Sequence, residues 1–211
     1  MTKTRLEAFS DGVIAIAITL LVLELRPPDI EAGQTLLDAL WHEWPSYVAY
    51  VVAFAQLGVI WLNHHRLFQQ VERVDGTLLL LNLNLLLWVV LIPFPTAVVA
   101  AHLGDGGEPA RTAVAFLAAT FFVTAVSFVA LFLWVTRKGS LVAEPATPAA
   151  RRAARVRFSF GLGAYLVAFL VALVAPWLSL AIQLAVALYY AFDQATVARE
   201  ATPPSAVTDL G

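Results

Sequence analysis

A few polar side chains stand beside a long apolar run near the N-terminus, and these residues could carry chemistry. Ser10 and Asp11 come just before this run. A charged group inside a membrane span costs about 2.5–3.5 kcal/mol on insertion scales, so a charge that is retained there usually has a role. Alternatively, Asp11 is an interfacial acid that the positive N-terminal end of a helix stabilises. The choice depends on which other polar groups lie at the same depth.

Polar residues in two later apolar segments are expected at the depth of this pair. The second segment ends in a polar run, and the third carries two asparagines one to two turns from the same side. A buried carboxylate needs hydrogen-bonding partners in lipid, and these groups are within reach. We therefore predict one buried polar network that joins the first three helices and contains Ser10, Asp11, Trp61, Asn63, His64, Asn82 and Asn84.

Two adjacent histidines suggest a different chemistry, an intramembrane enzyme in which His64, His65 and an acid hold a metal ion. Adjacent side chains on a helix point about 100° apart, whereas ligands on one helix face are favoured at a spacing of i, i+4. This mismatch argues against a metal shared by the two histidines. The chain also lacks cysteine, which excludes disulfides, thiolate nucleophiles and cysteine-based metal sites. We expect no enzyme, no catalytic residue, no metal site and no cofactor.

The elements that position these residues are predicted to be transmembrane helices. Of the 211 residues, 60% are hydrophobic and 13% are charged, whereas a soluble domain is about 45–50% apolar and about 25% charged. Apolar runs long enough for a hydrocarbon layer of about 30 Å recur along the chain, which indicates an all-α, polytopic membrane protein. We predict a membrane domain over 1–195, a disordered cytoplasmic tail over 196–211, and six transmembrane helices at about 5–25, 46–65, 77–101, 112–136, 157–175 and 177–193.

The basic residues predict how these helices cross the membrane. With a cytoplasmic N-terminus, all but two of the 13 Lys and Arg residues lie in the termini and the even-numbered connections, the exceptions being Arg26 and Arg111. The positive-inside rule therefore places both termini in the cytoplasm. We expect a multi-pass protein of the cell (plasma) membrane. Membrane lipid is the expected surrounding partner. The formal net charge of −2 gives no reason to expect a nucleic-acid partner.

The first predicted helix carries one apolar stripe with a single hydroxyl. Steps of three and four residues from Phe9 reach Ile16, then Thr19 or Leu20, and then Leu23, which places these residues on one helix face. An isolated stripe of this kind most often serves lipid-facing or core packing. The pattern alone therefore leaves packing and pore lining as alternatives.

The start of this helix resembles a known family signature. The motif Arg-x-x-x-Phe-Ser-Asp at residues 5–11, followed by the apolar run 15–23, is similar to the first-helix signature of the endosomal–lysosomal potassium channel family and its bacterial six-helix homologues. Trp61 and His64 at the end of the second predicted helix match the family's pattern. The Pro-Phe-Pro sequence at 93–95, late in the third predicted helix, matches it as well.

This resemblance implies a homotetramer in which the first helix of each subunit lines a central pore for potassium ions. It implies a potassium-selective or potassium-preferring cation channel without a backbone-carbonyl filter, and the chain contains no Thr-Val-Gly-Tyr-Gly sequence. The constriction that it implies is hydrophobic. The family's pore positions fall here on Ile16, Thr19 and Leu23, with Leu20 as a neighbour on the same face, and the signature adds Arg5 and Phe9 to the polar network.

A proton-conducting protein or secondary transporter is the alternative, with Asp11 and His64 as a proton relay. Transporters commonly contain paired broken helices. The sequence gives no sign of such a pair, although Pro93 could break one helix. A channel would give unitary currents and a transporter would not.

Overall fold

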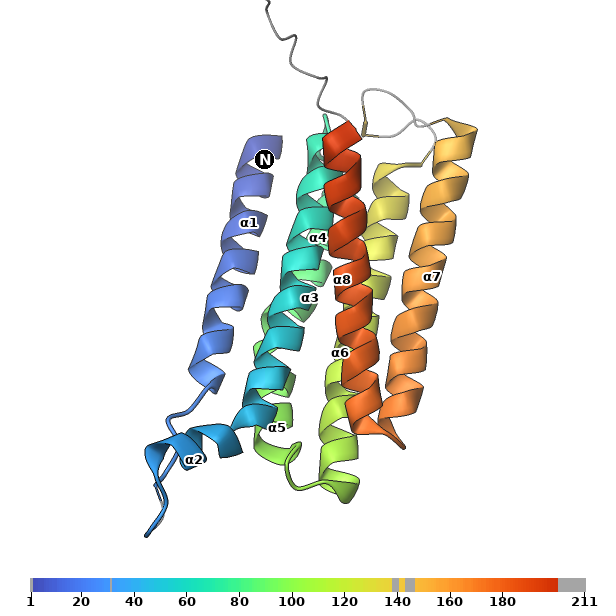
Figure 1. Cartoon of the computed structure of the whole chain (residues 1–211). Coiled ribbons are helices and arrows are strands. Elements are labelled where there is room, and N and C mark those ends of the chain that lie inside the picture. The colour runs from blue at the N-terminus through green and yellow to red at the C-terminus, as the bar shows by residue number, and fades with distance from the viewer. Residues whose placement is uncertain (1, 31, 138–140, 143–146, 201–211) are drawn as a thin grey trace, which may run out of the picture.

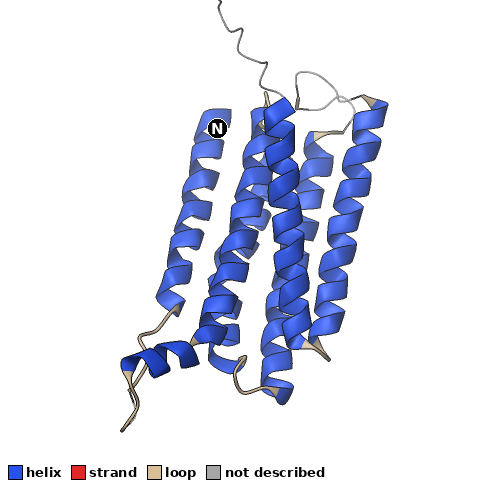
Figure 2. Cartoon of the chain, viewed as in Figure 1, coloured by secondary structure: helices blue, strands red, loops and turns tan. Residues whose placement is uncertain are grey.

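Helices form almost all of the computed structural model, which describes residues 2–30, 32–137, 141–142 and 147–200 (Figure 2). Within these residues no strand is formed, and one isolated antiparallel bridge joins Val71 to Val142. The expected all-α class is confirmed. In chain order the elements are α1 (Lys3–Leu20), the 3-10 helix η1 (Leu21–Glu24), α2 (Leu36–His42), α3 (Trp44–Gln69), α4 (Gly76–Leu91), α5 (Pro93–His102), α6 (Gly107–Val135), α7 (Pro148–Ala172) and α8 (Pro176–Glu200).

Several of these helices are long and apolar enough to cross a membrane. Four segments meet this description: α1 with η1, α3, α4 with α5, and α6. Each has at least the roughly 20 residues that a hydrocarbon core of about 30 Å requires. The fifth and sixth expected spans correspond to shorter apolar helices, Phe158–Ala172 and Pro176–Phe192, within α7 and α8.

The first helix differs at both ends from the expected range of 5–25. It begins at Lys3, because Thr2 is the N-cap and its Oγ1 accepts a hydrogen bond from the backbone N–H of Arg5 at 3.4 Å. The α-helix ends at Leu20, and the chain continues as the 3-10 helix η1. The 3-10 form is narrower and longer per residue than an α-helix, so it changes the spacing of the side chains at this end.

Pro93 divides the third expected helix, 77–101, into two. α4 ends at Leu91 and α5 begins at Pro93, with Ile92 between them. Proline lacks a backbone N–H, and its ring clashes with the carbonyl of the residue four positions earlier, so it breaks or kinks a helix. Beyond the break, the carbonyl oxygen of Ile92 accepts from the backbone N–H of Thr96 at 3.2 Å and from the Thr96 hydroxyl at 2.8 Å.

A short helix outside the predicted spans, α2, lies crosswise at one corner of the bundle, below α1 and next to the start of α3 (Figure 1). Thr35 and Asp38 form a capping box at its start: Asp38 N donates to Thr35 Oγ1 at 3.2 Å, and Thr35 N donates to Asp38 Oδ2 at 3.3 Å. The signal was present, since a Thr-x-x-Asp sequence at the start of an apolar run is a known capping-box pattern.

The helix α1 lies at one edge of the bundle, and α7 lies at the opposite edge (Figure 1). α1 packs against α3 and α4, whereas α6, α7 and α8 pack closely against one another. The contact face of α1 consists of Leu6, Ser10, Ile14 and Ala17, which are all buried. One side of α1 is therefore fixed by its own chain, and the other side is open.

The last helix extends past the expected end of the membrane domain. α8 continues to Glu200, whereas the membrane domain was expected to end at residue 195 and a disordered tail to begin at 196. The rest of that expected tail, 201–211, lies outside the described residues.

Candidate functional site

All the pore positions expected on α1 and η1 lie on the face that the chain's own packing leaves open. Ile16 is 59% exposed, Leu20 37% and Leu23 69%. Thr19 and Phe9 are exposed on the same side. Exposed residues of this size form a continuous apolar stripe along the helix, which in a membrane must face either lipid or another copy of the chain. We call this set, without Phe9, the open stripe.

The hydroxyl of Thr19 is oriented by its own helix. Its Oγ1 donates a hydrogen bond to the backbone carbonyl oxygen of Ile16 at 2.8 Å. A hydroxyl has one hydrogen to donate and two lone pairs that accept. Because the hydrogen is used within the helix, the oxygen presents only acceptor capacity to a ligand outside it. Such an oxygen suits a cation.

The two apolar ends of the open stripe lie farther apart than a continuous α-helix would place them. From Ile16 to Leu20 the chain is α-helical, and from there to Leu23 it follows the 3-10 helix η1. At about 1.5 Å per α-helical residue and about 2.0 Å per 3-10 residue, the rise between the two side chains is roughly 12 Å rather than roughly 10 Å. Thr19 lies between them.

A buried chain of hydrogen bonds joins the contact face of α1 to α4 and α3. Asn82 Nδ2 donates to Ser10 Oγ at 2.9 Å, and Asn82 Oδ1 lies 2.9 Å from His64 Nε2. The Ser10 hydroxyl donates in turn to Leu6 O at 2.9 Å. Since the Asn82 oxygen can only accept, Nε2 of His64 carries the ring proton. Ser10, His64 and Asn82, the inner chain, are each fully buried.

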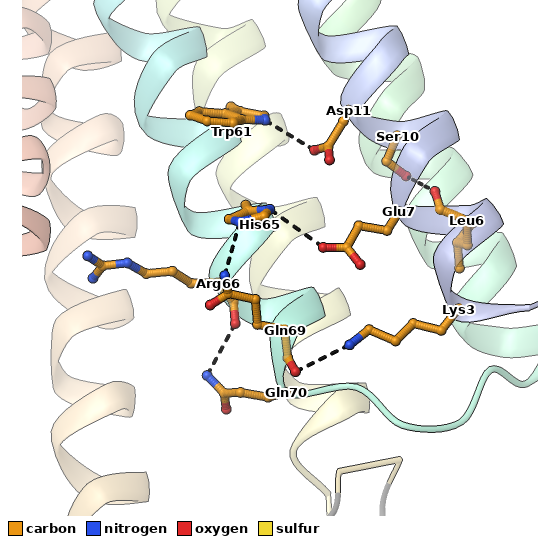
Figure 3. Close-up of polar contacts among 10 residues, drawn as sticks. All are labelled: Lys3, Leu6, Glu7, Ser10, Asp11, Trp61, His65, Arg66, Gln69 and Gln70. Carbon is orange, nitrogen blue, oxygen red and sulfur yellow. Dashed lines mark hydrogen bonds and ion pairs between the residues drawn. The ribbon is translucent and has the colours of Figure 1, made fainter. Parts of the chain in front are cut away.

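A second set of polar contacts, the outer ladder, joins the more exposed sides of α1 and α3 (Figure 3). Its rungs follow one another at four-residue steps on both helices, which keeps them on facing surfaces. The rungs join Trp61 Nε1 to Asp11 Oδ1 at 3.1 Å, His65 Nδ1 to Glu7 Oε1 at 3.5 Å, and Lys3 Nζ to Gln69 O at 3.3 Å.

The expected single polar network is therefore two separate sets, and four of its expected members belong to neither. Asn84 Nδ2 donates to Ser127 Oγ on α6 at 2.9 Å, and Asn63 Nδ2 donates to the backbone of its own helix at Val59 O, 3.0 Å away. Residues two apart on a helix do not share a face, so Asn84 cannot lie on the same side as Asn82. Arg5 and Phe9 are exposed.

Asp11 and His64, the expected proton relay, are not hydrogen-bonded to each other. Asp11 accepts from Trp61, whereas His64 pairs with Asn82. Successive residues of a helix point about 100° apart, so Ser10 enters the inner chain and Asp11 the outer ladder. The same rotation separates His64 from His65. Glu7 and Lys3 were not among the predicted members of the network, although the four-residue spacing of Lys3, Glu7 and Asp11 indicates one helix face.

Comparisons with known proteins find channels of one family. The model of the family described as endosomal/lysosomal potassium channel TMEM175 matches residues 5–93. A potassium channel of Streptomyces collinus is 43% identical over 95% of this chain and 98% of its own length. A potassium channel of Chamaesiphon minutus is 40% identical over 89% of this chain and 92% of its own length. The crystal structure of a lysosomal potassium-selective channel TMEM175 homolog from Chamaesiphon minutus superposes with a TM-score of 0.80 at 38% identity, covering 91% of this chain and 97% of that one.

Proposed function

Because the chain belongs to the TMEM175 family of potassium channels, we propose that it forms a potassium-selective or potassium-preferring cation channel in a membrane. The observation that carries this function is the open stripe on α1. It is apolar, continuous and unpacked within its own chain, and it offers one oriented oxygen at Thr19. Ion channels are not enzymes, and the proposal requires no catalytic residue and no cofactor.

The channel is a homotetramer in this proposal, with the first helix of each subunit around a central axis. The position of α1 at the edge of the bundle supports it, because the open stripe can meet its symmetry copies without displacing α3 or α4 (Figure 1). The apolar parts of α7 and α8, Phe158–Ala172 and Pro176–Phe192, supply the fifth and sixth membrane crossings in this proposal. Both termini then lie in the cytoplasm, and the protein resides among the lipids of the plasma membrane.

Conduction is limited by two apolar rings in this arrangement. Copies of Ile16 form one ring and copies of Leu23 form the other, with Leu20 beside it. An apolar constriction opposes ion passage by dewetting, since ions lose hydration there and gain no replacement ligands. The Ile16 and Leu23 rings therefore set the barrier that a potassium ion must cross.

Selectivity for potassium comes from the Thr19 ring in this proposal. Each Thr19 side chain faces the axis in this arrangement, and its oxygen can act only as an acceptor there because its hydrogen is bonded to Ile16 O. A sparse ring of neutral oxygens replaces only part of an ion's hydration shell. Such a ring favours potassium over sodium, because sodium holds its water more strongly.

The substitution Thr19→Val tests this proposal, because valine keeps the width of the side chain and removes its oxygen. We expect the bi-ionic reversal potential of the purified channel in planar bilayers, with potassium on one side and sodium on the other, to shift toward equal permeability. Thr77→Val is a matched control, since Thr77 is exposed at the start of α4. If Thr19→Val keeps the wild-type reversal potential, Thr19 does not contact the permeating ion.

A further inference from the structure

Three side chains of the outer ladder bring potential metal ligands together. A carboxylate oxygen of Glu7, a carboxylate oxygen of Asp11 and a ring nitrogen of His65 all lie within 4.8 Å of one another. Glu7 and Asp11 lie four residues apart on α1, which places them on the same helix face. His65 faces them from α3 (Figure 3). We propose that Glu7, Asp11 and His65 form a binding site for a divalent transition-metal cation of the zinc class, which bridges α1 and α3.

The donor set fits such a cation. Zinc binds imidazole nitrogen at about 2.0–2.1 Å and carboxylate oxygen at about 2.0–2.2 Å in tetrahedral geometry, which places neighbouring ligand atoms roughly 3.3 Å apart. His65 Nδ1 and Glu7 Oε1 are already 3.5 Å apart. A third ligand from Asp11 leaves the fourth position for water. The two carboxylates four residues apart repel each other, and a divalent cation between them would remove that repulsion.

The surroundings of His65 favour the same assignment. Its Nδ1 is inaccessible to solvent and has no partner in hydrogen-bonding geometry among the described residues. Its other ring nitrogen, Nε2, lies 3.0 Å from the side-chain amide of Gln69. Metal-binding histidines commonly use the second ring nitrogen to donate to a nearby acceptor, and the Gln69 amide oxygen can fill that role after a rotation of the amide.

The neighbours of the site hold the ligands in place. Trp61 Nε1 donates to Asp11 at 3.1 Å, and the Trp61 ring stacks on His65 with centroids 5.7 Å apart. The ammonium group of Lys3 donates to Gln69 O at 3.3 Å, and within the described part of the chain it forms no ion pair with Glu7 or Asp11. The site lies outside the open stripe, and cation binding there does not depend on ion conduction.

Calorimetric titration of the full chain with zinc chloride tests this site directly. The protein is purified in detergent without an affinity tag and freed of metal with a chelator. We expect saturable binding of one ion per chain, weakened about tenfold or more in Glu7→Gln and in His65→Gln. Glu72→Gln and His102→Gln are matched controls, because both side chains are exposed and lie outside the site, and both should bind zinc as the wild type does.

Thermal unfolding supplies a second readout that needs no calorimetry. Zinc should raise the unfolding midpoint of the wild type and leave that of Glu7→Gln unchanged, because a cation that binds only the folded pair of helices stabilises it. Gel filtration shows whether each variant is folded. If His65→Gln misfolds, Glu7→Gln alone still tests the site. Absence of saturable binding in the wild type, or equal affinity in the wild type and both site variants, would overturn the proposal.

Discussion

Two histidines that are adjacent in the chain have different roles because a helix rotates each residue about 100° from the last. His64 points inward and pairs with Asn82, whereas His65 points toward Glu7. The same rotation assigns Ser10 to the inner chain and Asp11 to the outer ladder. Stability and metal binding therefore belong to neighbouring residues, and single substitutions can separate them.

At the residue scale, Ser10→Ala should destabilise the protein more than the loss of an exposed hydroxyl does. The substitution leaves Asn82 Nδ2 without its acceptor in a fully buried position. An unsatisfied buried group costs about 1–3 kcal/mol. The measurement is the free energy of unfolding in detergent, with Ser159→Ala as the matched control because Ser159 is exposed. Equal stability of the two variants would refute a structural role for the inner chain.

Sequence reasoning reached some of these residues and missed others for a physical reason. The spacing of Ile16, Thr19 and Leu23 placed them on one face of α1, and the structure leaves that face exposed. Periodicity within one helix reports which residues share a face. It does not report how two helices are rotated against each other, so it could not separate Asn82, which faces Ser10, from Asn84, which faces α6.

At the element scale, Asp75 joins the start of α4 to the end of α6. Its carboxylate accepts from Leu78 N at 2.7 Å, from Trp134 Nε1 at 3.1 Å and from Arg137 at 3.4 Å. Arg137 also lies over the Trp134 ring, with its guanidinium carbon 3.2 Å from the ring centroid. The backbone hydrogen bond from Leu78 is the largest cause that holds the pKa of Asp75 below its ordinary value, followed among the favourable contacts by the bond from Trp134.

This lowered pKa predicts how stability depends on pH. A carboxyl group whose pKa is lower in the folded state stabilises the protein above its unfolded pKa of about 4, and the contribution is lost as the pH falls through the folded pKa. Asp75→Asn keeps an N-cap acceptor but removes the charge. We expect the variant to unfold at a lower temperature than the wild type at pH 6.

The difference between Asp75→Asn and the wild type should narrow below about pH 4, because there the unfolded wild-type chain takes up a proton on Asp75 that the folded chain takes up only at lower pH. Thermal unfolding at pH 6 and at pH 3 measures it. Asp29→Asn removes one exposed negative charge elsewhere and controls for net charge. A difference between Asp75→Asn and the wild type that is the same at both pH values would show that the charge of Asp75 does not stabilise this junction.

Most elements were predictable from apolar periodicity, but their ends need other signals, and the break in the third expected helix was signalled by Pro93 rather than by periodicity. The start of α1 depends on Thr2 as the cap, and the division of the third expected helix depends on Pro93. The 3-10 turn in η1 has no distinctive residue pattern, because its sequence Leu-Val-Leu-Glu also suits an α-helix. Its geometry comes from packing, which places Leu21 in the core.

At the scale of the whole molecule, copies of α1 surround a conducting pore in the proposed channel. A single chain leaves the open stripe uncovered, and one helix cannot enclose a pore. The oligomer therefore decides whether Ile16 faces ions or lipid. The sequence of one chain, read by periodicity alone, cannot distinguish these environments, because an apolar residue suits both.

Current through single channels of the Ile16→Asn variant shows whether α1 lines the pore. The purified wild type, Ile16→Asn and Leu80→Asn are each reconstituted into planar bilayers with potassium on both sides. Leu80 is 70% exposed on α4, so Leu80→Asn is a control that introduces the same polar side chain on a different surface. We predict unitary currents in all three proteins, with a larger current in Ile16→Asn, because asparagine hydrates the narrow apolar ring. An Ile16→Asn current equal to that of the wild type and of Leu80→Asn would contradict pore lining by α1.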